Sequence, residues 1–252
     1  MNPPVTVQAA AKLTLSLRIT GVRPDGYHLI DAEMVSLAWS DTLTIDDGAH
    51  GLSADGPFAA GVPLDDSNLV AQALRLVHRQ AAVHVHKAIP QGGGLGGGSA
   101  DAAAVLRWAG YTDVIGAARL GADVPFCLVG GRARVKGIGE AIEPLPFLPL
   151  DITLVIPPLA ISTPAAYWAW DKLGGQRAKG PNDLEPAAIA VEPRLARWRD
   201  RIREAAAAAP TLAGSGATWF LLGHHPHLVD ALPDAVVVQT RTDRPPVMAS
   251  GR

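Results

Sequence analysis

The sequence has little cysteine and no excess of charge of either sign. Cys127 is the only cysteine in 252 residues, which excludes an intramolecular disulfide framework and a cysteine-rich zinc site. The 22 lysines and arginines nearly balance the 24 aspartates and glutamates, so a general affinity for the nucleic-acid backbone is not expected. The single cysteine also agrees with a reducing compartment, and we expect a cytoplasmic protein.

Signals for secretion and for membrane insertion are missing as well. Residues 1–4 have neither the basic nor the apolar region of a secretory signal. Two runs without charged residues or histidine, 152–170 and 205–223, are long enough to span a membrane, but prolines and glycines interrupt both. The sequence therefore predicts a soluble protein without a membrane segment.

Length and element order place the chain among globular proteins. Its 252 residues, 48% of them hydrophobic, suffice for one or two domains with buried cores. The expected elements follow the order β-β-α-β, then a glycine-rich loop and a helix, then β-α-β, which predicts an α+β fold. The proline-rich residues 144–149 lead us to expect two domains, 1–148 and 149–252.

Periodicity predicts the individual elements. Alternating apolar and polar residues indicate a half-buried strand over residues 12–19, with Lys12 and Thr14 on its polar face. Residues 48–63 are expected to form a loop, and Ser67 to cap the helix that follows. The other expected elements are strands at residues 42–45, 83–87, 152–156, 218–222 and 235–238 and helices at residues 102–108 and around residues 195–202.

Glycine is concentrated between a predicted strand and a predicted helix. Six of the seven residues from 92 to 98 are glycine, and such a run lets backbone N–H groups converge on an anion. The N-terminus of the following helix adds its partial positive charge. A flexible linker is the alternative, but linkers are not usually tied directly to a strand and a helix. This segment therefore predicts phosphate binding.

Two common phosphate loops do not match this segment. A Walker A loop has a lysine directly after its last glycine, and no lysine follows Gly98. Residues 92–97 satisfy the dinucleotide pattern G-x-G-x-x-G, and Asp113 lies near the distance at which such a site needs an acidic residue. The apolar residues beside Asp113 are too few to form the second strand that a dinucleotide fold requires.

Five separated segments resemble one family. They are, in chain order, residues 11–15, 23–28, 89–101, 120–126 and 212–216. Together they resemble the GHMP kinases, whose mark is the glycine loop. The sequence Pro-Asp-Gly-Tyr-His at residues 24–28 is similar to the branch that acts on a cytidine-diphosphate-linked methylerythritol in the non-mevalonate isoprenoid pathway. It does not point to the homoserine or mevalonate kinases.

The resemblance implies a fold and an activity. The fold has two α+β domains, an N-terminal one like domain 2 of ribosomal protein S5 and a ferredoxin-like C-terminal one. The activity is an ATP- and Mg²⁺-dependent transfer of the γ-phosphate to the C2 hydroxyl of a small-molecule substrate. Asp123 would accept or orient the proton of that hydroxyl, and Lys12 would neutralise charge beside it. Taken alone, Asp123 is an ordinary helix cap before Pro125, and Lys12 a solvated strand residue.

ATP binding is implied for the glycine loop and for one asparagine near the adenine. These residues are Asn68, Pro90, Gln91, Gly92, Gly93, Gly94, Leu95, Gly96, Gly97, Gly98, Ser99 and Ala100. Without the resemblance, Asn68 is simply a residue in the first turn of a helix. The metal ligands are not identified, and the chain is expected to act as a monomer or a homodimer.

Substrate binding is implied for two aromatic segments and one glycine turn. The residues are Tyr27, His28, Tyr167, Gly214 and Ser215. The ring of Tyr27 would stack on the cytosine base, and His28 would meet the polar edge of that base. Tyr167 is the expected second stacking ring, with Trp168 as a rival. For the turn at Gly214, a tight turn without a binding role is the alternative.

Two positions depart from the family pattern. Thr14 stands where asparagine is frequent, so it keeps a hydroxyl but loses the reach of an amide. Asp101 also stands where asparagine is common and adds a negative charge near the phosphates. It could help to hold Mg²⁺, or it could face away as a first-turn residue. Both departures leave Lys12 and Asp123 in place.

Two other functions stay open at this point. One is a GHMP kinase with another acceptor, of the homoserine or mevalonate type. The other is a nucleotide-binding regulator that has lost catalysis, although the presence of both Lys12 and Asp123 argues against it.

Overall fold

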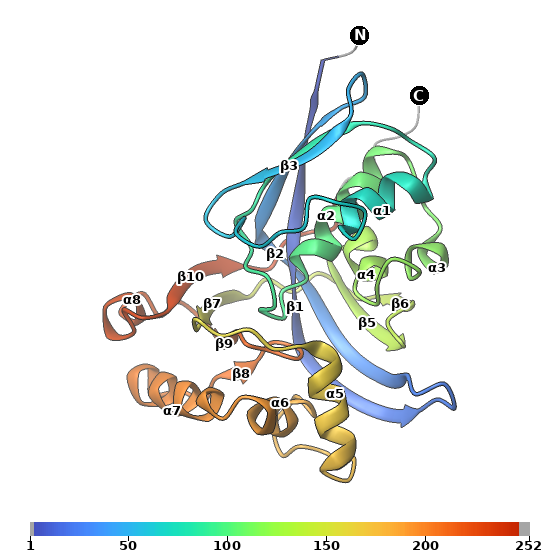
Figure 1. The fold of residues 1–252 in the computed structure, drawn as a ribbon. Coiled ribbons are helices and arrows are strands. Elements are labelled where there is room, and N and C mark those ends of the chain that lie inside the picture. Colours follow the sequence, from blue (N-terminus) through green and yellow to red (C-terminus); the bar gives the residue numbers. More distant parts are fainter. Residues whose placement is uncertain (1–2, 247–252) are drawn as a thin grey trace.

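The chain folds into two sheets with helices packed around them (Figure 1). A computed structural model describes residues 3–246. The first sheet has the strand order β3-β4-β2-β5-β6, with β1 paired to β2, and the second has the order β10-β7-β9-β8. Because largely antiparallel sheets combine with helices that do not alternate regularly with the strands, the fold is α+β, as predicted.

The first sheet and its helices come from the N-terminal part of the chain. Its strands are β1 (Val5–Val22), β2 (His28–Asp46), β3 (Gly51–Asp55), β4 (Ala82–His86), β5 (Arg132–Gly137) and β6 (Ala141–Pro144). Its helices are α1 (Leu69–Leu76), α2 (Gly97–Trp108), α3 (Val114–Ala117) and α4 (Val124–Val129).

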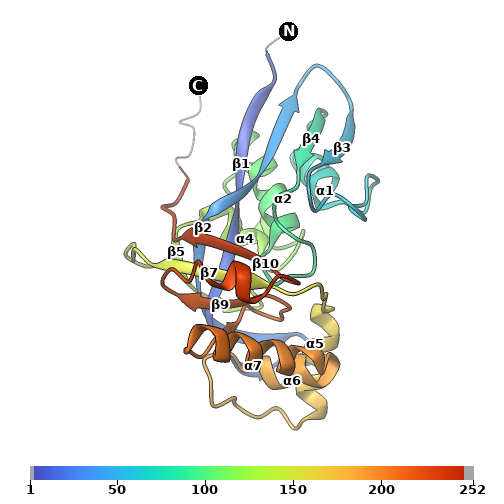
Figure 2. The ribbon, with the colours of Figure 1, turned by 90° about the vertical axis from the view of Figure 1, so that its left-hand side faces the viewer.

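The second sheet and its helices follow residue 148. The strands are β7 (Asp151–Ile156), β8 (Thr211–Leu212), β9 (Trp219–Leu222) and β10 (Val236–Arg241). The helices are α5 (Thr163–Lys172), α6 (Glu185–Val191), α7 (Arg194–Ala206) and α8 (Leu228–Ala231). Figure 2 shows α6 and α7 side by side below the second sheet. No helix within residues 3–246 is both long and apolar enough to cross a bilayer.

β1 and β2 form a long antiparallel pair that runs from Val5 opposite Ile45 to Val22 opposite His28. The centre of β1 is buried on both faces, since Lys12 is 5% and Thr14 2% exposed. The predicted wet, polar face is therefore wrong for these two residues. The glycine loop and the turn at residue 214 cover that face.

Three further local predictions need correction. Residues 51–55 of the expected loop form β3, which pairs in parallel with β4; this edge strand is too short and too polar to produce a periodic signal. The cap of α1 is Asn68, whose Oδ1 accepts from the Val70 amide at 2.8 Å, whereas the Ser67 hydroxyl donates to Asp65. Helix α2 begins at Gly97, five residues before its predicted start. The sequence did not indicate this start because glycine has a low helix propensity.

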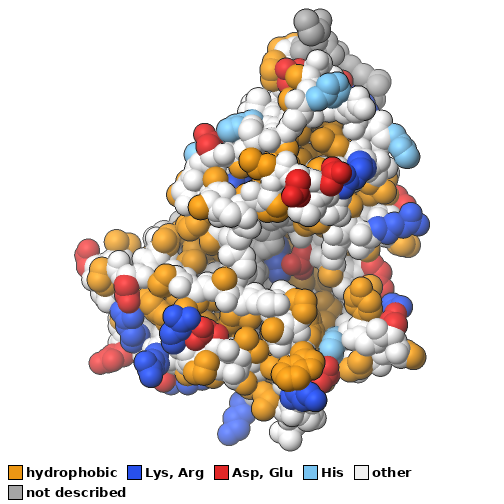
Figure 3. All heavy atoms as spheres, in the orientation of Figure 1, with side chains coloured by type: hydrophobic (Ala, Val, Ile, Leu, Met, Phe, Trp, Pro, Cys, Tyr) orange, Lys and Arg blue, Asp and Glu red, His pale blue; other side chains and the backbone are white. Residues whose placement is uncertain are grey.

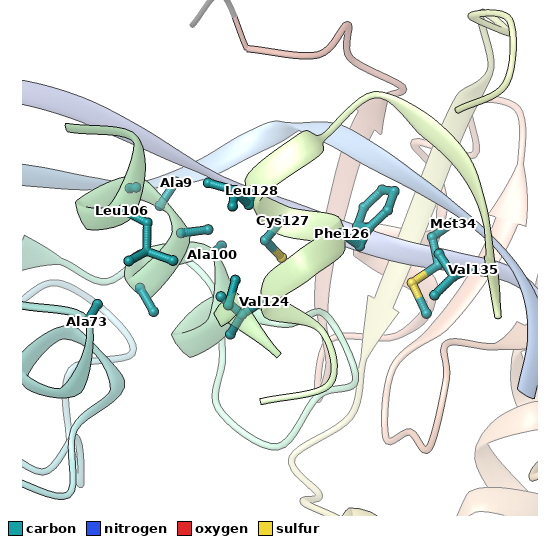
Figure 4. Packing of buried hydrophobic residues seen from close by; sticks show 14 of the residues in the cluster. Ala9, Met34, Ala73, Ala100, Leu106, Val124, Phe126, Cys127, Leu128 and Val135 are labelled. Carbon is teal, nitrogen blue, oxygen red and sulfur yellow. The ribbon is translucent and has the colours of Figure 1, made fainter. Parts of the chain in front are cut away.

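The main hydrophobic core packs α2 and α4 against the first sheet (Figure 4). Leu106, Val124 and Phe126 lie at its centre and are fully buried. The same core includes Trp170 and Leu184, which come from beyond residue 148. The two parts of the chain therefore share buried apolar surface, which is the main stabilising contribution to folding.

Candidate active site

A cavity of about 470 Å³ lies where the glycine loop, the start of α4 and the turn at residue 214 meet β1. Figure 3 shows a hollow between the upper and lower parts of the molecule, with basic and acidic side chains inside it. Lys12, Asp123, Gly214 and Ser215 line this cavity together with most of the glycine loop. Residues more than 200 positions apart in the sequence thus face one space.

Lys12 and Asp123 form an ion pair in this cavity, with Nζ 3.2 Å from Oδ2. The Lys12 side chain is 6% exposed and that of Asp123 33%, so the carboxylate remains accessible to a ligand. Asp123 occupies the N-cap position of α4, but its side chain caps no helix amide. The interpretations as an ordinary cap and as a solvated strand lysine are therefore both wrong.

The Lys12 ammonium is held on several sides. Its Nζ donates to Thr14 Oγ1 at 3.3 Å, so the threonine that departs from the family pattern contacts this lysine. The aliphatic part of Lys12 runs so close to Gly96 that a Cβ there would lie 2.7 Å from Lys12 Cγ. These contacts fix the ammonium between β1 and the glycine loop before any ligand binds.

The glycine loop is an ordered structure and not a flexible linker. Gly94 has a φ of +77°, and a Cβ at this position would lie 2.2 Å from the carbonyl oxygen of Ala213. The carbonyls of Gly92 and Gly93 accept from the amides of Ala217 at 3.3 Å and Thr218 at 3.2 Å. The loop therefore packs tightly against the second half of the chain.

The loop ends at a helix N-terminus that can receive an anion. Gly96, with a φ of +68°, is the N-cap of α2, and no side chain caps this helix. Its first turn contains no acidic residue. The first amides of a helix have no intrahelical partner, and the helix dipole makes this end partly positive. The loop and the first turn of α2 are thus suited to bind a phosphate chain.

Some residues expected at the ATP site do not line this cavity. Leu95 and Ala100 are fully buried behind the loop, with 0% and 1% exposure. The Asn68 side chain is used locally, because its Nδ2 donates to the Pro63 carbonyl at 2.7 Å while its Oδ1 caps α1. Its neighbour Leu69 lines the cavity instead.

Asp101 lies beyond the first turn of α2, and it points away from the cavity. It is 4% exposed, and its Oδ2 contacts Lys87 Nζ at 2.6 Å. Lys87 also pairs with the fully buried Asp41. The expected Mg²⁺ contact of Asp101 is therefore wrong. The alternative, that Asp101 faces away from the phosphate side, agrees with the structure, although the residue lies beyond the first turn and is buried against Lys87. Burial raises the pKa of Asp101 to about 7, although the Lys87 ammonium acts in the opposite direction.

A second cavity of about 460 Å³ adjoins the first. Tyr27, His28, Tyr167 and Trp168 line it. Tyr27 is 59% and Trp168 63% exposed, whereas the Tyr167 ring packs on His28 with a centroid distance of 4.8 Å. Burial raises the pKa of the Tyr167 phenol, which therefore stays protonated. A cavity lined by several aromatic side chains can stack on a flat ring ligand.

Asn182 is a buried residue near the site that the sequence reasoning missed. Its Nδ2 donates to the carbonyls of Gly214 at 2.7 Å and Leu212 at 2.9 Å, so it fixes the turn at residue 214. Ser215 in the same turn shares a hydrogen bond of 2.9 Å with the Thr163 hydroxyl. The only sequence signal was a polar Asn-Asp pair after Pro181, which is typical of many turns.

Comparison with known proteins places the chain in a family. Residues 68–131 match the model of the GHMP kinases N terminal domain. The 4-diphosphocytidyl-2-C-methyl-D-erythritol kinase of Paracoccus denitrificans is 42% identical over 231 residues, which cover 84% of each chain. A crystal structure of 4-(cytidine 5'-diphospho)-2C-methyl-D-erythritol kinase superposes with a TM-score of 0.73 at 30% identity, covering 95% of this chain and 100% of that one.

A more distant match agrees in fold alone. The homoserine kinase of Cytophaga hutchinsonii reaches a TM-score of 0.65 at 16% identity, over 97% of this chain and 96% of that one. The two closer matches cover 84% or more of both chains. The chain belongs to the 4-diphosphocytidyl-2-C-methyl-D-erythritol kinase family of the GHMP kinases.

Proposed function

We propose that this protein transfers the γ-phosphate of ATP to the C2 hydroxyl of 4-diphosphocytidyl-2-C-methyl-D-erythritol in the non-mevalonate isoprenoid pathway. The observation that carries this proposal is the position of the Lys12–Asp123 pair. This pair, in which Lys12 Nζ lies 3.2 Å from Asp123 Oδ2, is placed between the glycine loop and the aromatic cavity. Phosphoryl transfer needs a donor, a charged centre and an acceptor in this order.

The two cavities offer room for one elongated acceptor. Ala122, Ile138, Thr163 and Tyr167 line both of them, so the cavities are adjoining parts of one site. A base between aromatic rings in the second cavity would place a diphosphate-linked polyol at Asp123 in the first. Tyr27 and Tyr167 are the rings proposed to flank the base, and Ser215 and the turn at Gly214 form the polyol side.

Asp123 and Lys12 perform separate tasks in the proposed reaction. The Asp123 carboxylate accepts or orients the proton of the acceptor hydroxyl, since it is accessible and forms no helix-capping hydrogen bond. The Lys12 ammonium stabilises the negative charge that develops on the transferred group. Because Lys12 is fixed by Thr14 and the loop, little reorganisation is required during transfer.

The residues present fit a Mg²⁺ ion that enters with ATP. In kinase sites Mg²⁺ is held mainly by phosphate oxygens and water, with one or two protein oxygens. Asp123 is the one carboxylate among the described residues that line the first cavity, and the Ser99 hydroxyl lines it in the first turn of α2. We assign these two oxygen donors to the ion, which would neutralise charge on the triphosphate.

The proposal is tested with purified protein, ATP, Mg²⁺ and the cytidylyl substrate, with the phosphorylated product detected by ³¹P NMR. Asp123→Asn preserves size but removes the base, and we expect it to lower kcat by about 10²–10⁴-fold. Circular dichroism should show an unchanged fold. Homoserine and mevalonate serve as competing acceptors, and preferred turnover of either would overturn the proposal. ATP binding without turnover of any acceptor would instead support a regulator.

A further inference from the structure

His28 is hydrogen-bonded to a carboxylate from another part of the chain. Its Nε2 lies 2.9 Å from Oδ1 of Asp171, 143 positions away in the sequence. His28 begins β2, and Asp171 lies in the last turn of α5. Both residues line the second cavity. The contact therefore belongs to the proposed base-binding pocket and not to a remote surface.

This contact determines which ring nitrogen of His28 carries the proton. A carboxylate only accepts hydrogen bonds, so Nε2 must be the donor. In a neutral imidazole the other nitrogen, Nδ1, is then an acceptor. No residue between 3 and 246 donates a hydrogen bond to this Nδ1. Its lone pair is thus available to a ligand.

Packing holds the imidazole ring in one orientation. The Tyr167 ring lies 4.8 Å from it at an interplanar angle of 34°, and Trp170 meets it nearly edge-on at 5.6 Å and 83°. The His28 side chain is only 9% exposed. Rotation of the ring would break the hydrogen bond to Asp171 and disturb both aromatic contacts.

Helix stability does not explain the position of Asp171. A negative charge in the last turn of a helix faces the negative end of the helix dipole, which is unfavourable. The Asp171 side chain is 46% exposed, so burial does not require it either. Its one hydrogen bond to a side chain in the described structure is the one to His28.

We propose that Asp171 is a positioning residue that keeps Nδ1 of His28 as an acceptor and thereby selects cytosine over uracil. Cytosine presents an amino group at its fourth ring position, which donates to Nδ1. Uracil presents a carbonyl oxygen there, which would face the lone pair of Nδ1 without a proton between them. This inference rests on the proposed function, because it assumes that the second cavity binds the base of the acceptor.

The experiment compares wild-type protein with Asp171→Asn and Asp171→Glu. An asparagine can turn either its oxygen or its amino group toward Nε2, so it no longer enforces one tautomer. A glutamate keeps the carboxylate. We expect Asp171→Asn to lower the ratio of kcat/KM for the cytidine substrate to that for its uridine analogue by about tenfold, the worth of one net hydrogen bond. Asp171→Glu should retain most of the wild-type ratio.

A spectroscopic measurement tests the tautomer without substrate. Long-range ¹H–¹⁵N spectra at pH 8.5, where an ordinary imidazole is neutral, should show His28 protonated on Nε2 in the wild type and as a tautomer mixture in Asp171→Asn. A His28→Gln variant identifies the signals among the eight histidines. A proton on Nδ1 in the wild type, or an unchanged substrate ratio in Asp171→Asn, would overturn the inference.

Failure of the proposed function gives a different pattern. If the wild type phosphorylates neither acceptor, the proposed activity is wrong. The tautomer and the relative affinity for CDP and UDP, measured by thermal shift, then still decide the role of Asp171. Equal affinity for CDP and UDP in the wild type would count against the selection of cytosine.

Discussion

Asp101 places a second carboxylate beside one buried ammonium. Lys87 contacts both Asp41 and Asp101, and all three side chains are at most 6% exposed. Burial alone would lower the pKa of Lys87, but the two carboxylates together raise it, so the lysine stays charged. One of the two Asp101 oxygens, Oδ1, has no hydrogen-bond partner. When Asp101 carries a proton, the charges of Lys87 and Asp41 cancel and the cluster of three side chains is neutral.

The stability of the protein should reflect this proton. The pKa of Asp101 rises from 3.8 to about 7 in the folded state. Between these values the folded state keeps a proton that the unfolded state has lost, so stability falls as pH rises through this window. We expect the free energy of unfolding of the wild type, measured in urea, to fall relative to that of Asp101→Asn between about pH 4 and pH 7. Above pH 7 the difference between the two proteins should stay constant.

The same variant tests the discarded Mg²⁺ role. Asp101→Asn should leave the Mg²⁺ concentration needed for half-maximal activity unchanged, because Asp101 faces Lys87 and not the cavity. A marked increase in this concentration would contradict the buried position of the carboxylate.

At the scale of elements, the segment from Pro181 to Asp183 connects β1 to the turn at residue 214. Leu17 of β1 donates to the Pro181 carbonyl and accepts from the Asp183 amide, both at 2.9 Å. Asn182 lies between them and holds the turn through its amide group. The fully buried Asp183 pairs with Arg18 at 2.8 Å. Three consecutive residues thus set the distance between β1 and the turn at residue 214.

Asn182→Asp should change both the stability of the protein and the KM for the acceptor. The aspartate keeps an acceptor for the Leu184 amide but loses both donated hydrogen bonds. We expect a loss of about 1–3 kcal/mol in the free energy of unfolding, since buried carbonyls lose their donors. The KM for the acceptor should rise as the turn at residue 214 loosens. Urea unfolding and steady-state kinetics measure the two effects, and wild-type values in both would refute this role.

Local patterns predicted the elements whose two faces differ. The strand at residues 83–87 and the helix near residue 198 follow the expected periodicity. The strand at residues 152–156 was predicted from its continuous apolar run, and it is buried along its whole length. The full length of β1 was not visible, because residues 9–11 before the predicted strand are alanines, which have a low strand propensity. The start of α2 was hidden because its first two residues are glycines.

The candidate site was predictable only where a residue acts through a local motif. The glycine loop was predicted from its run of glycines, and the resemblance to the GHMP kinases indicated Lys12 and Asp123 as catalytic candidates. The contacts of Asn182, Asp171 and Asp101 were not predictable, since each depends on a partner more than ten positions away. Propensity and periodicity describe one element at a time and contain no information on such partners.

The whole molecule shares its core across residue 148. Trp170 and Leu184 complete the main core, and a further cluster combines Leu13 of β1 with Ile152 and Phe220 of the second sheet. The proposed domains of residues 1–148 and 149–252 therefore depend on each other. A fragment of residues 1–148 should expose apolar surface and lose cooperative unfolding.

Calorimetry and dye binding on this fragment test the dependence. We expect no sharp thermal transition and strong binding of a hydrophobic dye, whereas the intact chain should show one transition. A fragment that melts as sharply as the intact chain would show that the first domain is stable alone.

Gly96 and Lys12 belong to different sequence motifs, but their close approach in the structure links the two positions. A side chain at position 96 would collide with the aliphatic part of Lys12, so the glycine leaves room for the lysine in addition to its proposed role at the phosphates. Substitutions at the two positions are therefore not independent. Shortening Lys12 first removes the collision at position 96 and leaves only the strain of a side chain at a φ of +68°, whereas the reverse order adds the collision to that strain. Substitutions at these two positions thus have a preferred order.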